Sequence, residues 1–447
     1  MILKQILVIG AGKSATVLID YLKEVCVDRK WRLIVADANL EQAQQKVGDC
    51  ANAQVIELNV TDEQERKMLI EEADIVISML PPFLHILVAK DCVAICRTLL
   101  TASYADEAIR SLEAEIKAKE LLFICEMGLD PGIDHMSAMK LIDGIKADGG
   151  KINSFKSHCG GLVAPESDTN PWHYKISWNP RNIVMAGSAG AAYKEANEIV
   201  RKQYTHVFEN CAQLKIDDLP NLAWYPNRDS LSYIPLYQLQ NAETFIRTTL
   251  RYAPFCNGWD VVVDLDLTNE NDADDITQHK SFQDWFAFKL KKIEGREMSF
   301  RMYLELYVAE AEHDQILEQF EFLELNSMEL LPATLKSSAD ILQFRIEKKL
   351  QLLPSDKDLI VMLHEIEYVS AIGKKETVHS SLVVKGEDSL RTAMAKTVGL
   401  PLGIAAKLIL EEKIKLTGLH IPIHKEIYEP VLEELKANGI VFTEIHS

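Results

Sequence analysis

A glycine-rich turn near the beginning of the chain has the spacing that holds the phosphates of a dinucleotide. It consists of Gly10, Ala11, Gly12, Lys13, Ser14 and Ala15. This is the G-x-G-x-x-A pattern, in which Gly10 permits the tight turn and Gly12 admits a pyrophosphate close to the backbone. Ala15 is small enough for close helix–strand packing, and the N–H groups at the helix start would face the phosphates. We therefore expect these six residues to contact a dinucleotide cofactor.

An acidic residue indicates which dinucleotide this would be. Asp37 ends the second apolar run, at the place about 20 residues after the glycines where a carboxylate accepts both ribose hydroxyls. A carboxylate there would repel a 2′-phosphate, and no Arg or Lys occurs in residues 38–40. The prediction is therefore NAD rather than NADP. The alternative role for Asp37 is to cap the helix expected to begin at Leu40.

Three further segments follow predicted strands and are candidates for contact with the nicotinamide or a substrate, because doubly wound sheets bind ligands outside the carboxyl ends of their strands. They contain Met79, Leu80 and Pro81, then Ser103 and Tyr104, and finally Leu129, Asp130 and Pro131. Asp130 lies in a Gly-Leu-Asp-Pro-Gly sequence, so the backbone there is sharply shaped. An ordinary turn aspartate is the alternative interpretation.

The elements that would position these residues alternate regularly over the first 127 residues. Short apolar runs, separated by helical patterns, lie at 5–9, 32–37, 54–58, 74–80, 98–102 and 121–125. Near-continuous apolar strands between helices are typical of a parallel sheet that is covered on both faces. The sequence therefore predicts an α/β fold with a Rossmann-like, doubly wound parallel sheet.

The pattern changes after Gly132. A helix is expected over 133–146, and longer two-faced runs at 259–267 and 299–304 are interpreted as strands. Together with helices within 282–328, they predict a central α+β domain.

The last fifty residues regain α/β character. Helices are expected over 389–412 and 430–438, the second with Pro430 at its start and Gly439 after its end. We expect this tail to complete the first domain. The predicted division is a dinucleotide-binding domain over 1–131, a substrate-binding and dimerisation domain over 132–390, and a C-terminal return over 391–447.

Composition and charge exclude several classes of protein. Of 447 residues, 67 are acidic and 48 are basic, which gives a net charge of −19. A nucleic acid or an anionic membrane is not an expected partner, because binding either requires a basic face. The eight cysteines are scattered without a C-x-x-C pair, and we find no run of about 18 apolar residues that would span a membrane. These features predict a protein of the reducing cytoplasm without a metal site.

Ordered strings over almost the whole chain resemble the glutamate-forming saccharopine dehydrogenase family. The clearest are G-L-D-P-G-I-D-H at 128–135 and S-H-C-G-G-L-V-A-P-E at 157–166. Further strings lie at 170–171, 174–178, 225–230, 243–252, 397–401 and 418–419. Because they are long and mutually ordered, chance agreement is improbable.

The resemblance implies an oxidoreductase of lysine metabolism. Saccharopine would be oxidised to an imine as hydride passes to the nicotinamide, and water would then release L-glutamate and 2-aminoadipate 6-semialdehyde. The chain departs from fungal members at two places, with Asp37-Ala38 where they carry an arginine and Asn59-Val60 where they carry Asp-Val. The first difference again favours NAD. The second leaves open how Asn59 and Val60 contact the adenine side of the cofactor.

The same resemblance implies roles for individual residues. Arg228, Arg247 and Arg251 suit the substrate carboxylates, because guanidinium groups bind carboxylates in a bidentate manner. The other implied substrate contacts are Ser103, Tyr104, Asp130, Cys159, Gly160, Thr249 and Leu250, while Ser177 would touch cofactor or substrate. Asp130 would hold the substrate amine, and Tyr104, His135 and His158 are candidates for the proton acceptor.

Alternative interpretations stay open. Arg247 and Arg251 would share one face of a helix, where Arg247 could simply pair with Glu243, and Arg228 could pair with Asp229. A related imine reductase such as carboxynorspermidine dehydrogenase would act on a cationic substrate that needs no arginine cluster. The third possibility is a non-catalytic nucleotide-sensing homologue. A homodimer is implied by the resemblance alone.

Overall fold

The computed structural model describes residues 4–216 and 219–447, and the chain divides into two units. The first unit consists of residues 1–152, 236–238 and 367–447, and the second of residues 153–235 and 239–366. These bounds differ from the predicted breaks after 131 and 390. The first break lies later because α7 (Ile133–Ala147) packs on the C-terminal helix α17 (Lys425–Ala437) within the first unit.

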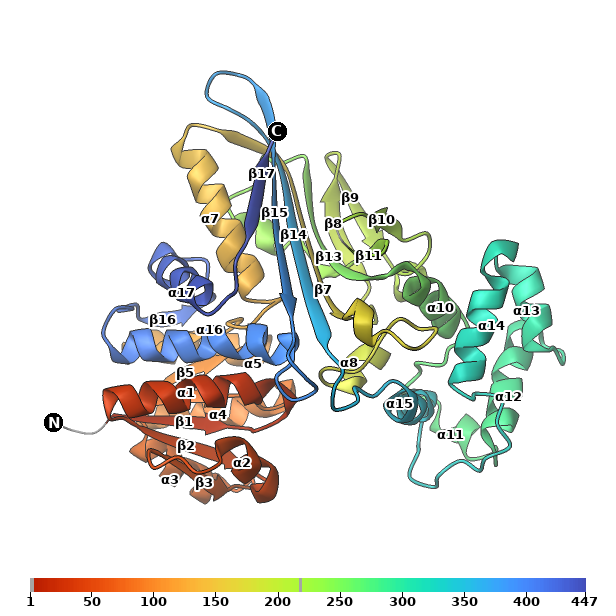
Figure 1. Cartoon of the computed structure of the whole chain (residues 1–447), viewed down its shortest axis with the longest axis horizontal. Coiled ribbons are helices and arrows are strands. Elements are labelled where there is room, and N and C mark those ends of the chain that lie inside the picture. Colours follow the sequence, from red (N-terminus) through yellow and green to blue (C-terminus); the bar gives the residue numbers. More distant parts are fainter. Residues whose placement is uncertain (1–3, 217–218) are drawn as a thin grey trace. The chain divides into compact units, whose positions relative to one another are not determined.

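The first unit contains a seven-stranded parallel sheet (Figure 1). Its strands are β1 (Gln5–Ile9), β2 (Arg32–Asp37), β3 (Ala53–Glu57), β4 (Ile75–Ser78), β5 (Thr98–Thr101), β6 (Leu122–Ile124) and β16 (Gly418–His420). They run in the order β16-β6-β5-β4-β1-β2-β3, and all neighbours are parallel. The order reverses between β1 and β4, where a doubly wound sheet binds its ligand. The predicted Rossmann-like fold is confirmed, and β16 completes it from the C-terminal segment.

The inner strands β1 and β4 of this sheet are buried along their whole length, as expected for a parallel sheet that is covered by helices. Besides α7 and α17, the helices of this unit are α1 (Thr16–Arg29), α2 (Leu40–Val47), α3 (Glu63–Glu72), α4 (His85–Ile95), α5 (Glu107–Arg110), α6 (Glu113–Ala118) and α16 (Ala393–Leu410). Outside the sheet, β15 (Lys375–Lys385) pairs with antiparallel β17 (Thr443–His446). The helix predicted over 430–438 begins earlier, at Lys425, so Pro430 lies inside it.

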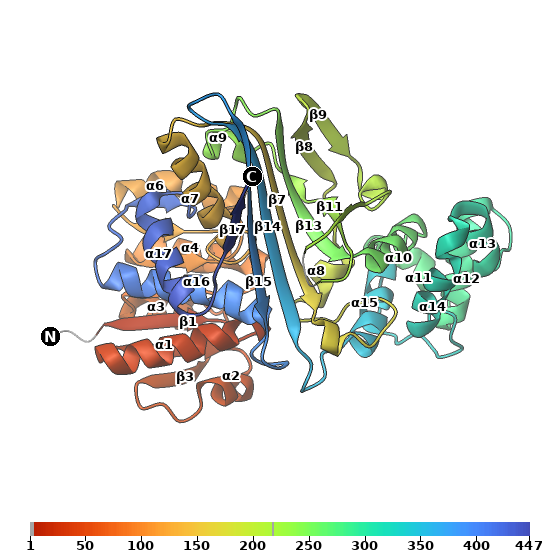
Figure 2. The same ribbon diagram turned by 45° about the horizontal axis from the view of Figure 1, so that its top comes forward.

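Helix α16 lies beside α1 in both views of the chain (Figures 1 and 2). The two helices approach closely at Gly399, where a Cβ atom would lie 2.9 Å from the backbone nitrogen of Leu18. By length and composition α16 could cross a membrane, but 78% of it is buried. Its apolar character is therefore explained by packing in the core of the first unit.

The second unit contains a mixed sheet. Its strands are β7 (Lys151–Val163), β8 (Ala191–Glu195), β9 (Glu198–Lys202), β10 (Ala212–Leu214), β11 (Leu222–Pro226), β12 (Arg228–Asp229), β13 (Thr244–Tyr252) and β14 (Asp358–Val369). The first two residues of β7 and the last three of β14 belong to the first unit. The central strand β13 is parallel to β7 and antiparallel to β11, in agreement with the predicted α+β character.

Helices occupy two segments that were predicted as strands. The helices of the second unit are α8 (Pro180–Val184), α9 (Tyr233–Leu236), α10 (Ala253–Asp264), α11 (Ala273–Ile276), α12 (Phe282–Glu294), α13 (Phe300–Tyr307), α14 (His313–Phe322) and α15 (Ser338–Lys349). The strand predictions for 259–267 and 299–304 are wrong, because α10 covers most of the first range and α13 most of the second. Pro254 lies in the first turn of α10, and Ser299 caps α13 by accepting the Met302 N–H.

Candidate functional site

The glycine turn follows β1 directly and is held to the neighbouring strands. Gly10 has φ +103°, and a Cβ atom there would lie 2.9 Å from the Met79 carbonyl, so only glycine fits without strain. The Gly10 N–H donates to the Ala36 carbonyl at 2.8 Å. Gly12, by contrast, has open space where its Cβ would be. The turn therefore presents an accessible backbone, as phosphate binding requires.

Residues 13–15 form a 3-10 turn, η1, that opens α1. Lys13 is exposed, Ser14 is half-buried, and Ala15 is buried. The Ala15 N–H is already used by the Gly12 carbonyl at 3.0 Å. The small side chain of Ala15 is buried at the start of α1, and its packing on a strand stays a prediction.

Both carboxylate oxygens of Asp37 accept backbone hydrogen bonds. Oδ2 accepts the Ala11 N–H at 2.6 Å, and Oδ1 accepts the Asn39 N–H at 2.7 Å. Asp37 therefore clamps the end of β2 to the glycine turn. The cap of α2 is Asn39, whose side chain accepts the Gln42 N–H, so the alternative role of Asp37 as that cap is wrong.

Lys46 brings a cation to the glycine turn. It lies in the last turn of α2, and its Nζ donates to the Gly12 carbonyl. Burial lowers the pKa of Lys46 to about 8, although the carboxylates of Asp37 and Asp20 oppose this shift. Lys46 lies beyond residues 38–40, the range in which such a cation was expected, and α2 carries it back to the turn.

The predicted contacts after β3 and β4 are loop residues. Asn59 is exposed, and its side-chain oxygen accepts the Thr61 N–H at 3.1 Å, while the Val60 carbonyl accepts a hydrogen bond from Arg66. Met79 and Leu80 are half-buried and Pro81 is exposed. The Met79 N–H donates to the Ile9 carbonyl at 2.8 Å, which ties this loop to the carboxyl end of β1.

Ser103 follows β5 and is held by its backbone and its side chain. Its N–H donates to Thr101 Oγ1 at 3.2 Å, and its carbonyl accepts the Glu126 N–H at 2.9 Å. Its hydroxyl oxygen lies 2.8 Å from His85 Nε2. Tyr104 beside it is half-buried. His85 is not among the predicted site residues, because it lies at an ordinary helix start with no motif around it.

The loop around Asp130 is tightly folded. The Gly128 N–H donates to the Pro131 carbonyl at 3.0 Å, and the Asp130–Pro131 peptide bond is cis. Gly132 has φ +146°, and a Cβ there would lie 2.1 Å from the Gly128 carbonyl oxygen. Leu129 and Pro131 are buried, whereas Asp130 is half-buried. Of the three predicted contact residues in this loop, Asp130 is therefore the one that is partly accessible to a ligand.

His135 lies behind that loop and is 0% exposed. Its Nε2 is 2.9 Å from Glu126 Oε2, and its Nδ1 is 2.5 Å from the Tyr237 hydroxyl. Because both ring nitrogens are engaged in the interior, His135 can influence a ligand only through its neighbours. Its predicted role as proton acceptor stays a prediction.

Arg247 and Arg251 are buried in the second unit and lie on a strand. The helix expected for Arg247 and Arg251 is wrong, because both belong to β13. Alternate residues of a strand face the same side, so Thr249 and both arginines still share one face. Thr249 is opposite Cys159 of β7 in the parallel register. Arg247, Thr249 and Arg251 therefore lie on one face because side chains alternate along a strand, and not because they are one helical turn apart.

Arg251 is buried among aromatic rings without a carboxylate. It is 5% exposed, and its guanidinium lies 5.4 Å from the ring centre of Tyr174 and 6.0 Å from that of Tyr225. Its Nη1 donates to the Leu250 carbonyl at 2.8 Å, whereas its Nε has no hydrogen-bond partner in the described chain. Burial raises the pKa of Tyr225 to about 12, so this hydroxyl does not supply a negative charge.

The remaining predicted substrate residues of the second unit differ in exposure. Arg247 is buried and stacks at 4.4 Å on the ring of Tyr233, whereas Arg228 is exposed and has φ +50°. A Cβ at Gly160 would lie 2.5 Å from the Leu250 carbonyl oxygen, so glycine allows β7 and β13 to pair there. Cys159, Leu250 and Ser177 are buried.

His158 is also buried in the second unit. Its Nδ1 lies 2.7 Å from Thr248 Oγ1, and its Nε2 lies 3.0 Å from Glu365 Oε2. Thr248 and Thr249 face opposite sides of β13. His158 therefore lies on the opposite face of the strand from Arg251, which argues against its use with a ligand bound there.

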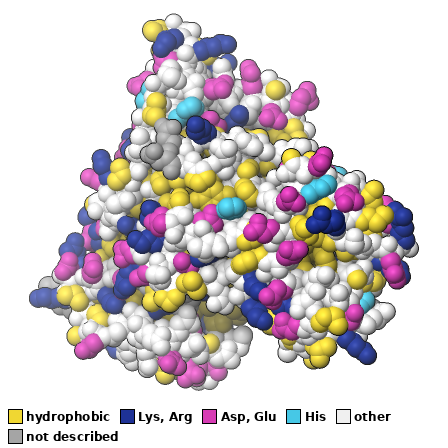
Figure 3. All heavy atoms as spheres, turned by 45° about the vertical axis from the view of Figure 1, so that its right-hand side comes forward, with side chains coloured by type: hydrophobic (Ala, Val, Ile, Leu, Met, Phe, Trp, Pro, Cys, Tyr) yellow, Lys and Arg dark blue, Asp and Glu magenta, His cyan; other side chains and the backbone are white. Residues whose placement is uncertain are grey.

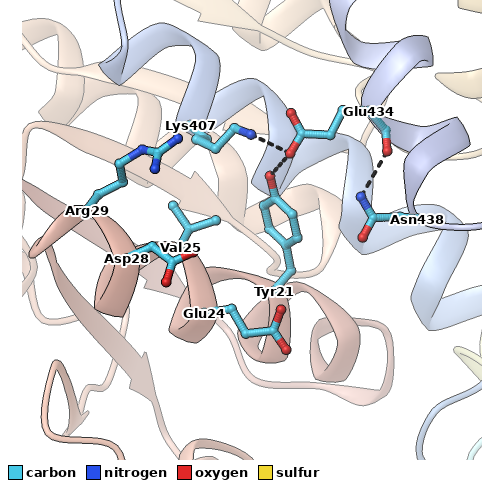
Figure 4. A pocket seen from close by; sticks show the side chains of 8 residues that line it. All are labelled: Tyr21, Glu24, Val25, Asp28, Arg29, Lys407, Glu434 and Asn438. Carbon is cyan, nitrogen blue, oxygen red and sulfur yellow. Dashed lines mark hydrogen bonds and ion pairs between the residues drawn. The ribbon is translucent and has the colours of Figure 1, made fainter.

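A small polar pocket occurs elsewhere in the first unit (Figure 4). It is lined by Tyr21, Glu24, Val25, Asp28, Arg29, Lys407, Glu434 and Asn438. Glu434 lies at its centre, where it accepts hydrogen bonds from the Tyr21 hydroxyl and from Lys407. These residues belong to α1, α16 and α17, and none of them is a predicted site residue. The pocket is formed by contacts that dock the C-terminal helices on α1.

The chain matches known proteins over its whole length. Two family models match it, the saccharopine dehydrogenase NADP binding domain over residues 6–124 and the saccharopine dehydrogenase C-terminal domain over residues 128–440. The saccharopine dehydrogenase (NADP(+), L-glutamate-forming) of Saccharomyces cerevisiae is 33% identical over 97% of both chains. The mitochondrial alpha-aminoadipic semialdehyde synthase of Mus musculus is 35% identical over 98% of this chain, which spans only 47% of that protein.

A solved structure agrees with these matches. The apo saccharopine dehydrogenase (L-Glu forming) from Saccharomyces cerevisiae superposes with a TM-score of 0.88 at 32% identity, and the match covers 99% of this chain and 100% of that one. The agreement extends over both units.

These comparisons correct the predicted cofactor. NAD was expected from Asp37, but the fungal relatives are named for NADP(+), and the matched N-terminal model is an NADP binding domain. The prediction is therefore wrong. In the structure, backbone N–H groups engage the Asp37 carboxylate, and Lys46 provides the cation that is missing from residues 38–40.

Proposed function

Because the chain belongs to the saccharopine dehydrogenase family, we propose that it interconverts saccharopine with L-glutamate and 2-aminoadipate 6-semialdehyde in lysine metabolism. NADP(H) is the proposed cofactor and exchanges a hydride with the substrate. The main support for this proposal is Arg251, a buried guanidinium that no carboxylate of the described chain neutralises. A buried charge is costly unless it is paired, so an anionic ligand is favoured beside it.

Arg251 supports a substrate carboxylate as that ligand. The aromatic rings around it exclude water, which strengthens a charge-assisted hydrogen bond. Its Nε is the N–H without a partner. Saccharopine carries three carboxylates, so one of them would satisfy both the charge and this donor.

The glycine turn supports the dinucleotide. Its accessible Gly12 backbone suits a pyrophosphate, and Lys46 suits the additional 2′-phosphate of NADP(H) because a lysine binds phosphate as a point charge. Asp37 would then act by shaping the turn through the Ala11 N–H. Ser103 and Asp130 remain the proposed contacts at the reactive end.

A polyamine-linked imine reductase is less well supported. Its substrate carries a net positive charge from several amines, which would place like charges near Arg251. A nucleotide sensor would likewise have no use for a buried guanidinium.

Absorbance at the NADPH band tests the proposal. Purified protein with saccharopine and NADP+ is expected to form NADPH and L-glutamate in equal amounts, more efficiently than with NAD+. Absence of NADPH over a broad pH range, or turnover of carboxynorspermidine instead, would contradict the proposal.

A further inference from the structure

A buried histidine connects the ends of β4 and β5. His85 is the first residue of α4, Ser78 is the last residue of β4, and Thr101 is the last residue of β5. His85 Nδ1 lies 2.7 Å from Ser78 Oγ, and its Nε2 lies 2.8 Å from Ser103 Oγ and 3.4 Å from Thr101 Oγ1. A Ser78–His85–Ser103 chain of hydrogen bonds therefore crosses this edge of the sheet.

The surroundings of Ser78 decide the direction of this chain. Ser78 is 1% exposed, and among the described residues its hydroxyl contacts only His85. If that hydroxyl accepted a proton from His85, its own hydrogen would be buried without an acceptor, which is costly. Thr101 is buried as well, but its Oγ1 lies 3.4 Å from Nε2, a weaker contact than the 2.7 Å between Ser78 Oγ and Nδ1. Ser78 therefore donates to Nδ1, and the imidazole carries its proton on Nε2. From there it donates to Ser103.

When His85 donates to Ser103, the hydroxyl hydrogen of Ser103 remains available for a ligand. The backbone N–H of Ser103 is bonded to Thr101 and its carbonyl to the Glu126 N–H. With His85 donating to its Oγ, the hydroxyl hydrogen of Ser103 remains to be donated. A hydroxyl oriented in this way is a fixed donor and no longer a free rotor.

We propose that His85 is a positioning residue that directs the Ser103 hydroxyl as a donor toward an acceptor oxygen of the bound ligand. The oxygen belongs either to a carboxylate of saccharopine or to the carboxamide of the nicotinamide. This inference rests on the proposed function for the identity of the ligand. It does not rest on that function for the direction of the hydrogen-bond chain, which the buried Ser78 sets.

The charge state of His85 agrees with this role. Burial lowers its pKa to about 4, and Asp106 only partly opposes the shift. The imidazole is therefore neutral around pH 7 and keeps one donor and one acceptor nitrogen. A histidinium would donate from both nitrogens and would reverse the bond to Ser78.

A double-mutant cycle tests the coupling. Ser103→Ala and His85→Leu are each expected to lower kcat/KM for saccharopine by about 10-fold or more, and the double variant should be no worse than Ser103→Ala. His85→Gln, which keeps a donor near the Nε2 position, should recover most of the loss. Losses that multiply in the double variant would overturn the proposal, because a merely structural histidine acts independently of Ser103.

Binding measurements on the same variants distinguish the two possible ligand oxygens, the saccharopine carboxylate and the nicotinamide carboxamide. A higher KM for saccharopine with an unchanged NADPH dissociation constant points to the carboxylate, and weaker NADPH binding points to the carboxamide. His446→Gln, at an exposed position, is the matched control and should change neither.

Nitrogen NMR of the imidazole needs no substrate and so separates this proposal from the proposed function. The His85 signals, assigned by their absence in His85→Gln, should show Nε2–H at pH 7. They should lose this single tautomer in Ser78→Ala. An Nδ1–H tautomer in the wild-type protein would overturn the proposal even if saccharopine turns over, and absent turnover would leave an Nε2–H result standing.

Discussion

Arg251 illustrates how one residue reports on a ligand. Most buried charges in this chain are paired, as Arg66 is with Asp91 at 2.6 Å, whereas Arg251 is surrounded by rings. The protein therefore carries an energetic cost at this position in the absence of a ligand. Such a cost is typical of functional sites, where a buried charge can be left unpaired in the free protein so that it can bind a ligand.

We predict that Arg251→Met raises the KM for saccharopine by about 100-fold, because a charge-assisted bond in a dry site is lost. NADPH binding should stay unchanged, since Arg251 lies in the other unit from the glycine turn. The melting temperature should not fall, because an unpaired buried charge is removed. Steady-state kinetics and calorimetry check this, with exposed Arg296→Met as control. A large loss of stability would instead assign Arg251 to the fold.

Lys46→Gln should weaken NADPH binding by about 10-fold and leave NADH binding nearly unchanged, because only NADPH has the 2′-phosphate. Lys46 is charged below its pKa of about 8, so wild-type affinity for NADPH should fall from pH 7 to 9 more steeply than that of the variant. Fluorescence titration measures both, with Lys425→Gln as an exposed control. Equal losses for the two nucleotides would contradict a phosphate contact.

The lowered pKa of His85 predicts acid sensitivity. Its ordinary value is 6.5 and its value in the fold is about 4, so the fold disfavours the protonated form. The free energy of unfolding is therefore highest above pH 6.5, where His85 is neutral in both the folded and the unfolded chain. It decreases as the pH falls toward 4, by about 3 kcal/mol at pH 4. His85→Gln should lack this component. Urea unfolding of both proteins at pH 7 and pH 4 checks the difference, which would vanish if His85 titrated normally.

At the scale of elements, packing of α16 on α1 ties the C-terminal return to the nucleotide turn. Gly399 permits the contact because any side chain would meet the Leu18 backbone at 2.9 Å. Helix α1 begins at the glycine turn, so its position depends on α16. The C-terminal segment thereby supports a site formed by the first residues of the chain.

Gly399→Ala should destabilise the protein by about 1–3 kcal/mol through overpacking. Gly144→Ala is the matched control, because Gly144 lies in α7 with nothing within 4 Å of its Cβ position. This control should be neutral or stabilising by about 0.5–1 kcal/mol. Urea unfolding gives both values, and equal effects would show that the close approach of α16 is not needed.

Two elements show where local patterns mislead. The runs at 259–267 and 299–304 are predicted as strands because they are long and two-faced. Both lie mainly in helices whose apolar residues enter one aromatic core. Helix α10 is buried over most of its length and so loses the 3.6-residue alternation, whereas α13 has only eight residues, too few to show its period.

At the scale of the molecule, the charge of −19 has to be reconciled with anionic ligands. Acidic and basic side chains are intermixed over the face shown in Figure 3. Such mixing gives little long-range attraction, and salt screens what remains. Binding of anions must therefore depend on local donors, namely the glycine turn with Lys46 in the first unit and Arg251 in the second.

The sequence by itself determined the dinucleotide turn and the parallel sheet, because a G-x-G-x-x-A turn and continuous apolar strands are encoded by neighbouring residues. Its motifs also indicated the family, and they predicted a shared face for Arg247 and Arg251 but assigned it to a helix, whereas both residues lie on strand β13. Only the tertiary structure decided what surrounds these residues. Lys46 at Gly12, His85 beside Ser103 and Arg251 without a carboxylate depend on contacts between distant segments and on burial. The charge state of such groups follows from their surroundings, and no local spacing encodes it.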